Sequence, residues 1–324
     1  MTSSKGIKAV PGDQIARAVW DGGTARVIAA ITTATAREAV RRHGASGQAA
    51  LALARGTTAG LLLATLTKDD ERVTLQVIGD GPLRGVTVDA RSSGGVRAYV
   101  KRLDGGLVTA NAGQRASLAA ALGRGGLVSV IRDVGLKENF SGQTPLVTGE
   151  LDTDVEHYLN TSEQIDSALA CDALFAAGWS DIVISGGILV QALPGSAGSA
   201  VIERARAVLR AGALPRALAA TPAPSAEELA RAVMTELVQS PSALPGSLPL
   251  QMLDVRPVRF ECPCSRERAQ GSLALLGGAE LASMIVEDGK AEVVCEFCRE
   301  RYEFSEGELE VIRRETAPRA GLPS

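Results

Sequence analysis

Four of the five cysteines in this 324-residue chain fall into two short pairs near its carboxyl end. The first pair is Cys262-Pro263-Cys264, and the second is Cys295-Glu296-Phe297-Cys298, thirty residues further on. Two short pairs separated by a loop are typical of tetrahedral Zn²⁺ sites, because each pair presents two thiolates to one side of the ion. We therefore expect these four cysteines to hold one Zn²⁺ ion per chain in the reduced protein.

The elements that must position these cysteines form a small module, which we place at residues 261–314, followed by a disordered tail at 315–324. The pattern predicts helices at Ser265–Leu276 and Ala279–Glu287 and short strands at Ala291–Val294 and Arg301–Phe304. A closing helix is predicted at Ser305–Arg313. A core this small contributes only about 3–5 kcal/mol, whereas structural Zn²⁺ in finger-like peptides contributes on the order of 10–16 kcal/mol. The module should therefore unfold if its thiolates are lost.

The same thiolates could also act as an oxidation switch. Zinc is redox-inert, but peroxide or hypochlorite can carry its thiolate ligands to sulfenic acid and then to disulfide. Each pair is close enough in sequence to bridge internally, Cys262 with Cys264 and Cys295 with Cys298. The spacing alone leaves a reversible switch and a purely structural zinc site equally open.

Two other interpretations of the cysteines fit less well. A nucleic-acid-binding zinc ribbon needs a basic surface, but residues 262–314 carry eleven Asp and Glu against seven Lys and Arg, and the whole chain has a net charge of −3. A thiol-disulfide oxidoreductase places its C-x-x-C at the start of a helix in a βαβ unit. Here the pair lies between two expected short strands and is accompanied by a second pair.

The first 208 residues predict an α+β domain of mixed sheet and helix. A hairpin is expected from two alternating runs, Arg72–Ile78 and Gly85–Ala90, around the turn residues Gly79-Asp80-Gly81-Pro82. Val96–Lys101 and Leu127–Asp133 should extend that sheet. Further strands are expected at Ala25–Ile31, Ser167–Ala176 and Asp181–Leu193. Helices are expected at Thr35–Arg42, Ser46–Leu66, Thr153–Gln164 and Ser199–Arg210.

We find no catalytic constellation and no nucleotide-binding motif in this domain. The glycine-rich segments Gly79-Asp80-Gly81 and Gly123-Arg124-Gly125-Gly126 lack the pattern of a dinucleotide site or a P-loop, so turns are expected. His43 follows two arginines at an expected helix end, and His157 lies on a charged helix face. Cys171 lies in an expected strand, where a free cysteine behaves as a small buried apolar residue. The sequence therefore predicts a protein that is not an enzyme.

The composition changes between residues 209 and 260, which we interpret as a linker. Seven of the fourteen prolines lie between Pro215 and Pro257, and such a segment cannot form a compact core alone. It contains one helix, marked by a capping box of Ser225 with Glu228 and an apolar stripe that includes Leu229, Val233 and Leu237. The helix is either a permanently docked linker helix or one that undocks and exposes apolar surface.

The chain has neither an apolar signal region at its start nor an apolar run of about 18 residues. We therefore expect a cytoplasmic protein with no membrane partner and no nucleic-acid partner. Cytoplasmic thiols are kept reduced, which favours metal ligands or redox sensors over structural disulfides.

The residues together resemble the heat shock protein 33 family of redox-regulated bacterial chaperones, the 33 kDa chaperonins. The strongest match is the C-x-C and C-x-x-C spacing, with Pro257-Val258-Arg259-Phe260-Glu261 directly before the first pair. Further matching motifs, in family order, are Gly79-Asp80-Gly81-Pro82, Tyr158 with Ser162-Glu163-Gln164, and Gly186-Gly187 with Val190-Gln191 and Leu193-Pro194-Gly195. The resemblance runs from about residue 12 to residue 314.

The resemblance implies an ATP-independent holdase that binds unfolding proteins under oxidative stress. It implies that the four cysteines bind zinc in the inactive reduced form and that oxidation pairs Cys262 with Cys264 and Cys295 with Cys298. Zinc would then leave, the linker would unfold, client-binding surface would be uncovered, and the activated subunits would form a homodimer. The family's linker commonly ends in an acidic stretch, whereas this chain has Leu248–Leu253 there, so the resemblance does not identify the client-binding residues.

Overall fold

The computed structural model of the chain describes residues 12–20, 23–68, 71–103, 115–133, 135, 140–179, 181–195, 198–239 and 250–316. The chain divides into two compact units, Met1–Glu261 and Cys262–Ser324. The boundary lies one residue after the start that the sequence suggested for the cysteine module. The expected linker, residues 209–260, belongs to the first unit.

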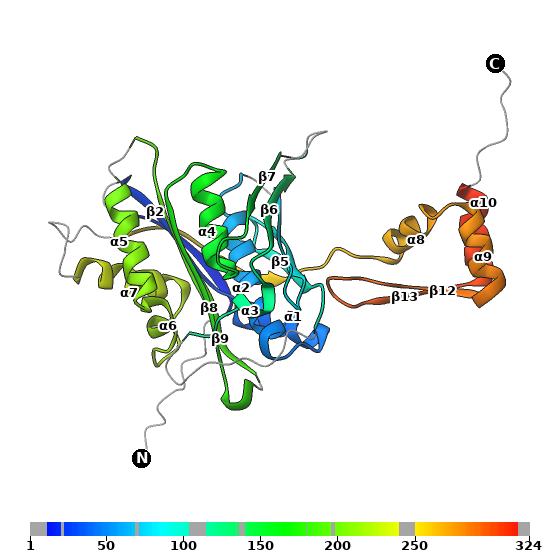
Figure 1. Cartoon of the computed structure of the whole chain (residues 1–324), viewed down its shortest axis with the longest axis horizontal. Helices are drawn as coiled ribbons and strands as arrows, with labels where there is room; N and C mark the ends of the chain where they lie inside the picture. Colours follow the sequence, from blue (N-terminus) through cyan, green and yellow to red (C-terminus); the bar gives the residue numbers. More distant parts are fainter. Residues whose placement is uncertain are drawn as a thin grey trace, which may run out of the picture. The chain divides into compact units, whose positions relative to one another are not determined.

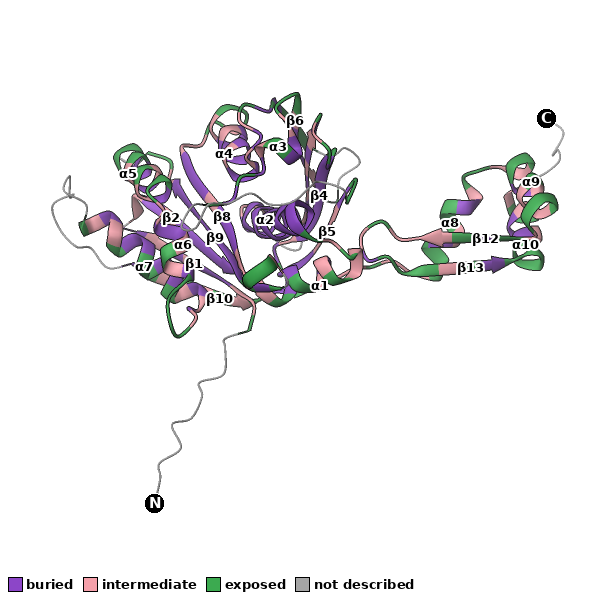
Figure 2. Ribbon diagram, turned by 60° about the horizontal axis from the view of Figure 1, so that its bottom comes forward, coloured by how far each residue is buried: buried purple, intermediate pink, exposed green. Residues whose placement is uncertain are grey.

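The first unit contains a five-stranded antiparallel sheet with the order β10-β1-β2-β9-β8. Its strands are β1 (Gln14–Trp20), β2 (Ala25–Ile31), β8 (Ser167–Phe175), β9 (Ile182–Ala192) and β10 (Gln251–Pro257). Strands β2, β8 and β9 are labelled in Figure 1, and all five strands are labelled in Figure 2. The three predicted strands β2, β8 and β9 are confirmed. Strands β1 and β10, which the sequence did not predict, pair with each other at one edge of the sheet.

A second sheet has six strands in the order β11-β5-β4-β3-β6-β7. Its strands are β3 (Arg72–Gly79), β4 (Gly85–Arg91), β5 (Gly95–Val100), β6 (Gly126–Asp133), β7 (Phe140–Pro145) and β11 (Arg259–Phe260). The predicted β3–β4 hairpin and its extension by β5 and β6 are confirmed. All pairs are antiparallel except the short β11, which lies parallel to β5.

Helix α2 (Gly47–Ala64) lies between the two sheets, and all eighteen of its residues are buried (Figure 2). A helix that is apolar on every side has to be enclosed in this way. At Gly60 of this helix, an added Cβ would lie 2.5 Å from the Val88 side chain on β4. The glycine therefore lets the helix approach the sheet closely.

The remaining helices of the first unit lie around this centre. They are α1 (Thr33–His43), α3 (Ala119–Leu122), α4 (Leu151–Thr161), α5 (Ser199–Arg210), α6 (Ala213–Leu218) and α7 (Ala226–Gln239). The last three pack on the outer face of the five-stranded sheet and share a second apolar core with it. This core has aliphatic side chains on both sides, since the chain contains few aromatic residues.

The predicted helix of the linker region is docked, and its capping box forms. The backbone N–H of Ser225 donates to Glu228 Oε2 at 2.8 Å, and the N–H of Glu228 donates to Ser225 Oγ at 3.2 Å. Leu229, Val233 and Leu237 are buried against the outer face of the five-stranded sheet. Strand β10, which lies in the same region, continues that sheet, so α6, α7 and β10 of the linker region are all integrated into the first unit.

The second unit is small. It contains α8 (Arg266–Ala274), α9 (Gly278–Asp288), the hairpin of β12 (Lys290–Val294) and β13 (Arg301–Ser305), and α10 (Glu306–Thr316). These five elements confirm the predicted helices and strands within a few residues. Its apolar core consists of only a few side chains, with Leu281, Phe304 and Leu309 at the centre. Of the expected tail, residues 317–324 lie outside the described part of the chain.

Within the described residues, no single helix is long and apolar enough to cross a membrane. The pair α8 and α9 meets the length and composition requirement only when its two members are taken together across a bend of 110°.

Candidate metal centre

The local backbone brings each pair of cysteines to a turn at the start or end of a regular element. Cys262 and Cys264 directly precede α8, whose N-cap residue Ser265 accepts a hydrogen bond from the Arg268 N–H at 3.3 Å. The second pair occupies the turn between β12 and β13. There the Cys295 N–H donates to Glu300 O and the Arg299 N–H donates to Cys295 O, both at 2.9 Å. The sequence prediction that this pair lies between two short strands is confirmed.

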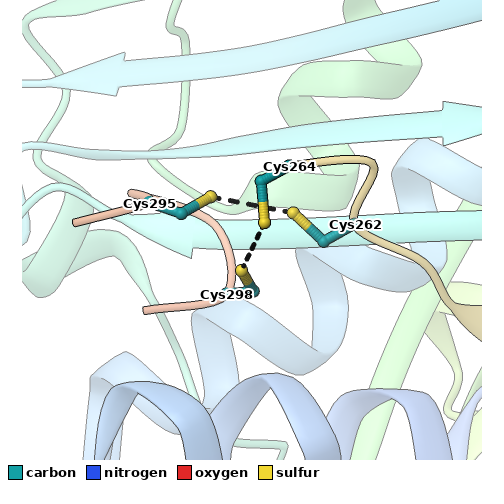
Figure 3. Close-up of side chains that lie close together, drawn as sticks. All are labelled: Cys262, Cys264, Cys295 and Cys298. Carbon is teal, nitrogen blue, oxygen red and sulfur yellow. Dashed lines mark hydrogen bonds between the residues drawn. The ribbon is translucent and has the colours of Figure 1, made fainter. Parts of the chain in front are cut away.

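The structure brings all four predicted cysteines together, and their sulfur atoms lie within 4.8 Å of one another (Figure 3). Cys262 Sγ is 3.7 Å from Cys295 Sγ, and Cys264 Sγ is 3.2 Å from Cys298 Sγ. A tetrahedral ion with metal–sulfur bonds of about 2.3 Å has sulfur–sulfur edges of about 3.8 Å. The cluster therefore fits a four-coordinate ion, and four sulfur donors favour a soft metal such as zinc over magnesium or calcium.

Tyr302 also touches the cluster, a contact that the sequence did not predict. The Tyr302 hydroxyl donates to Cys264 Sγ at 3.2 Å. That hydrogen bond raises the pKa of the Tyr302 hydroxyl, because it favours the protonated donor. The only sequence signal was a tyrosine on the returning strand, four residues after the second pair.

The surroundings of Cys295 and Cys298 favour the protonated thiol when no cation is bound. Burial raises the pKa of Cys298 and, to a smaller degree, that of Cys295. A metal ion must therefore displace protons as it binds. Three of the four cysteines remain partly accessible to solvent, and Cys298 is buried.

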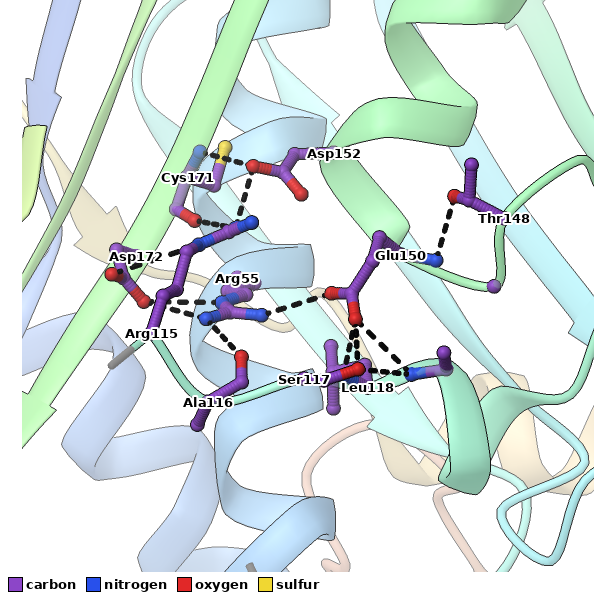
Figure 4. Close-up of polar contacts among 12 residues, drawn as sticks. Arg55, Arg115, Ala116, Ser117, Leu118, Thr148, Glu150, Asp152, Cys171 and Asp172 are labelled. Atoms are coloured by element: carbon purple, nitrogen blue, oxygen red, sulfur yellow. Dashed lines mark hydrogen bonds and ion pairs between the residues drawn. The ribbon is translucent and has the colours of Figure 1, made fainter. Parts of the chain in front are cut away.

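The fifth cysteine, Cys171, belongs to the first unit and is fully buried in β8. Burial raises its thiol pKa well above the ordinary value. Its backbone is held on both sides: the N–H donates to Asp152 Oδ2 at 3.0 Å, and the carbonyl accepts from Arg115 Nη2 at 2.7 Å (Figure 4). The prediction of a buried apolar cysteine is confirmed.

Around Cys171 lies a cluster of charged side chains that the sequence did not predict, in which Arg55, Asp152 and Asp172 are buried and Arg115 is partly exposed (Figure 4). Arg55 of α2 is fully buried and donates to Asp172 Oδ1 and to the carbonyl of Ala116, both at 2.7 Å. Arg115 donates to Asp152 Oδ2 at 2.6 Å. Each of these carboxylates is paired with a guanidinium group. The ion pairs and hydrogen bonds of the cluster connect α2, α4 and β8. An isolated arginine in an apolar helix is the only trace that it leaves in the sequence.

The two histidines and the two glycine-rich segments lie at helix and turn positions. His43 is the last residue of α1, as expected, and His157 is partly buried on α4. The two glycine-rich segments lie against each other: the Gly81 N–H donates to Leu122 O at 2.9 Å and the Gly125 N–H to Asp80 Oδ1 at 3.1 Å. These glycines allow two backbones to approach closely, in keeping with the predicted turn.

Comparison with known proteins connects this architecture to one family. The sequence model of the family described as "Hsp33 protein" matches residues 13–305. The 33 kDa chaperonin of Listeria monocytogenes is 35% identical over 303 residues, which cover 94% of this chain and 99% of that protein. The 33 kDa chaperonins of Bacillus subtilis and Gloeobacter violaceus are 34% and 38% identical, over 94% and 93% of this chain and 99% and 95% of their own lengths.

The fold has a counterpart among solved structures. The crystal structure of the 33 kDa chaperonin of Thermotoga maritima superposes with a TM-score of 0.76 at 29% sequence identity. The match covers 94% of this chain and 99% of that one. Both units therefore lie within the compared length.

Proposed function

The chain belongs to the Hsp33 family of chaperones, and on this premise we propose that it is a redox-regulated, ATP-independent holdase. In this proposal the reduced protein is inactive, and oxidation of the four-cysteine cluster makes it bind unfolding proteins. The observation that carries the proposal is the convergence of Cys262, Cys264, Cys295 and Cys298 in a unit with a very small core. If the fold of the second unit depends on these thiolates, their oxidation should unfold it.

The metal of the proposal is one Zn²⁺ ion per chain, held by the four cysteines in the reduced form. Bound there, the ion would cross-link the start of α8 to the β12–β13 turn. The distances between the sulfur atoms are compatible with such a site. Zinc binding contributes about 10–16 kcal/mol to the folding free energy of such sites, which exceeds what a core of this size contributes. Loss of the thiolate ligands should therefore unfold the second unit.

The proposed oxidation uses two electrons for each disulfide. One hydrogen peroxide molecule accepts two electrons from a pair of thiolates and, with two protons, leaves as two water molecules, while a sulfur–sulfur bond forms. By resemblance to the family, we propose the pairs Cys262–Cys264 and Cys295–Cys298. Cys262 Sγ lies 3.7 Å from Cys295 Sγ and Cys264 Sγ lies 3.2 Å from Cys298 Sγ, and neighbours within each pair also lie within 4.8 Å.

The proposed output is apolar surface released from the linker region, residues 209–260. Helix α7 places Leu229, Val233 and Met234 on the outer face of the five-stranded sheet, against residues such as Val27 and Ile31. If the linker undocks, both apolar faces become available to an unfolded client. Clients of mixed sequence require contacts of this non-directional kind.

The remaining parts of the proposal concern partners and location. We propose that unfolded or partly folded proteins are the clients and that activated subunits form a homodimer in the cytoplasm. Neither nucleic acid nor membrane has a part in the proposal, and no catalytic turnover is required. The excess of acidic over basic residues in 262–314 supports the omission of nucleic acid.

The proposal is tested by following zinc and chaperone activity in one sample, without ATP. The reduced, zinc-loaded protein and a peroxide-treated, mildly heated sample are compared for suppression of the aggregation of heat-denatured citrate synthase, while a colorimetric chelator reports released zinc. We expect zinc release and suppression to appear together. The variant Cys171→Ser should keep this switch, whereas Cys298→Ser should lose zinc binding.

Two results would contradict the proposal in different ways. If zinc leaves and aggregation is unaffected, the protein has an oxidation-sensitive site but no holdase activity. If activity appears while zinc stays bound, the cysteine cluster is a structural site and the switch lies elsewhere. Catalytic reduction of an added disulfide by substoichiometric protein would instead indicate a thiol-disulfide oxidoreductase.

A further inference from the structure

Four residues, Val258–Glu261, connect β10 to the first cysteine of the cluster; we call this segment the clasp. It is bound to the rest of the first unit by three backbone hydrogen bonds of 3.0 Å each, from Val258 N–H to Asp13 O, from Arg259 N–H to Gly94 O and from Glu261 N–H to Val96 O. Asp13 directly precedes β1 of the five-stranded sheet, and Val96 belongs to β5 of the six-stranded sheet. The clasp is therefore attached to both sheets within four residues.

Of the four side chains of the clasp, only that of Val258 is buried, where it packs into the main apolar core. Strand β11 of the clasp is only two residues long and pairs on one side, in parallel, with β5. Phe260 is partly exposed, and the Arg42 guanidinium lies 5.0 Å from the centre of the Phe260 ring. Segments at a sheet edge with few buried contacts open before the core does. The clasp has the properties of a segment that opens early.

Gly94 provides both the space and a hydrogen bond for the clasp. Its φ is +95°, and an added Cβ would lie 2.2 Å from the backbone oxygen of Pro257, a contact that no rotation of a side chain can relieve. Its own carbonyl accepts the Arg259 N–H. Any side chain at position 94 must therefore displace the chain at the junction of β10 and the clasp.

The last hydrogen bond of the clasp comes from Glu261, and Cys262 follows in the sequence. We propose that the clasp transmits the state of the cysteine cluster to the linker, an inference that rests on the proposed function. Folding of the second unit fixes the backbone of Cys262, so the adjoining Glu261 has less conformational entropy to lose when the clasp closes. Once that restraint is gone, the clasp opens and β10, an edge strand bonded only to β1, follows.

The clasp is tested with Gly94→Ala in the full-length, reduced, zinc-loaded protein. We expect amide hydrogen exchange in residues 255–261 to become at least about tenfold faster, because the substitution removes pairing that protects these amides. We also expect the reduced variant to suppress aggregation of citrate synthase while it retains its zinc and four reactive thiols. Gly178→Ala is the matched control, because Gly178 also has a positive φ, +74°, but nothing lies within 4 Å of the added Cβ.

A second variant, Phe260→Ala, removes the ring beneath Arg42 without a backbone clash and should accelerate the same amides if Gly94→Ala fails to fold. If neither variant exchanges faster than Gly178→Ala, the clasp does not hold the linker. If exchange accelerates but the reduced variants stay inactive while the oxidised native protein is active, the clasp is not the transmitting element. Inactivity of the oxidised native protein would instead remove the proposed function, and exchange would still report on the clasp.

Discussion

A cysteine responds to oxidants according to the exposure and thiolate character of its sulfur. In this chain the two extremes occur together. Cys171 is fully buried in β8 beside the paired charges of Asp152 and Arg115, and burial raises its thiol pKa well above the ordinary value. Cys262, Cys264 and Cys295 are partly exposed and lie among other sulfur donors. Metal binding would hold the clustered thiols as thiolates, so the cluster, and not Cys171, is where an oxidant should act first.

Asp152 shows how a single residue ties the stability of the first unit to pH. Burial by itself would raise the pKa of its carboxyl, but the positive charges of Arg115 and Arg55 outweigh burial, and the pKa is lowered. A carboxyl whose pKa is depressed by folding stabilises the protein above its unfolded pKa of about 3.9 and loses that effect as the pH falls.

We therefore expect Asp152→Asn to destabilise the first unit by about 2 kcal/mol at pH 7, a value below that of a fully buried pair because a third of the Arg115 side chain is exposed. The difference from the native protein should shrink as the pH falls toward 3.5. Urea unfolding followed by the fluorescence of Trp20 and Trp179, both in the first unit, measures it. An equal difference at both pH values would show that the Asp152 charge is not the cause.

Among the secondary-structure elements, α7 joins the linker region to the core. Its polar face carries Glu227 and Arg231, which pair at 2.8 Å on the surface, and its apolar face is buried on β1 and β2. Exposed pairs of this kind contribute only a few tenths of a kcal/mol. Docking of α7 therefore depends on its apolar stripe.

Val233→Ser should weaken this docking by about 2–3 kcal/mol, because it removes buried apolar volume and buries a hydroxyl in its place. The reduced variant should bind more of an apolar fluorescent dye, and the amides of α7 should exchange faster. Ala232→Ser introduces the same side chain on the exposed face of the same helix and should have neither effect. Identical dye binding by the two variants would mean that the stripe does not hold the helix.

Elements with strong local signals were predictable from the sequence, and those defined by distant partners were not. The β3–β4 hairpin, α5 and the capping box of α7 follow from alternation, apolar periodicity and capping residues within a few positions. Strand β10 was missed because its neighbours are rich in proline and its pairing with β1 spans more than 230 residues, as in the ion pair of Arg17 with Asp254. Long-range pairing leaves no local pattern.

The same distinction applies to the candidate site. Its four cysteines were found from their spacing alone, since metal ligation constrains residue type and sequence interval together. Tyr302 was missed as a contact of the cluster because its hydrogen bond to Cys264 depends on the register of the β12–β13 hairpin. Gly94 was missed because its tight contact with Pro257 joins residues far apart in the sequence.

At the scale of the whole molecule, the two units differ in what holds them together. The first has two sheets, a fully buried central helix and two extensive apolar cores. The second has one small core and a cluster of four sulfur atoms. In the proposed function, loss of the bound ion should therefore unfold the second unit while most of the first keeps its structure. The linker region, which belongs to the first unit, responds to that difference.

Hydrogen exchange of the full chain, measured by mass spectrometry before and after peroxide treatment with zinc release recorded in parallel, tests this central claim most directly. We predict that residues 262–316 and the described parts of 209–260 lose protection as zinc leaves, while α2, β3 and β9 keep theirs. The account is contradicted if zinc leaves and the linker region stays protected. It is equally contradicted if the central elements of the first unit lose protection to the same extent as the linker.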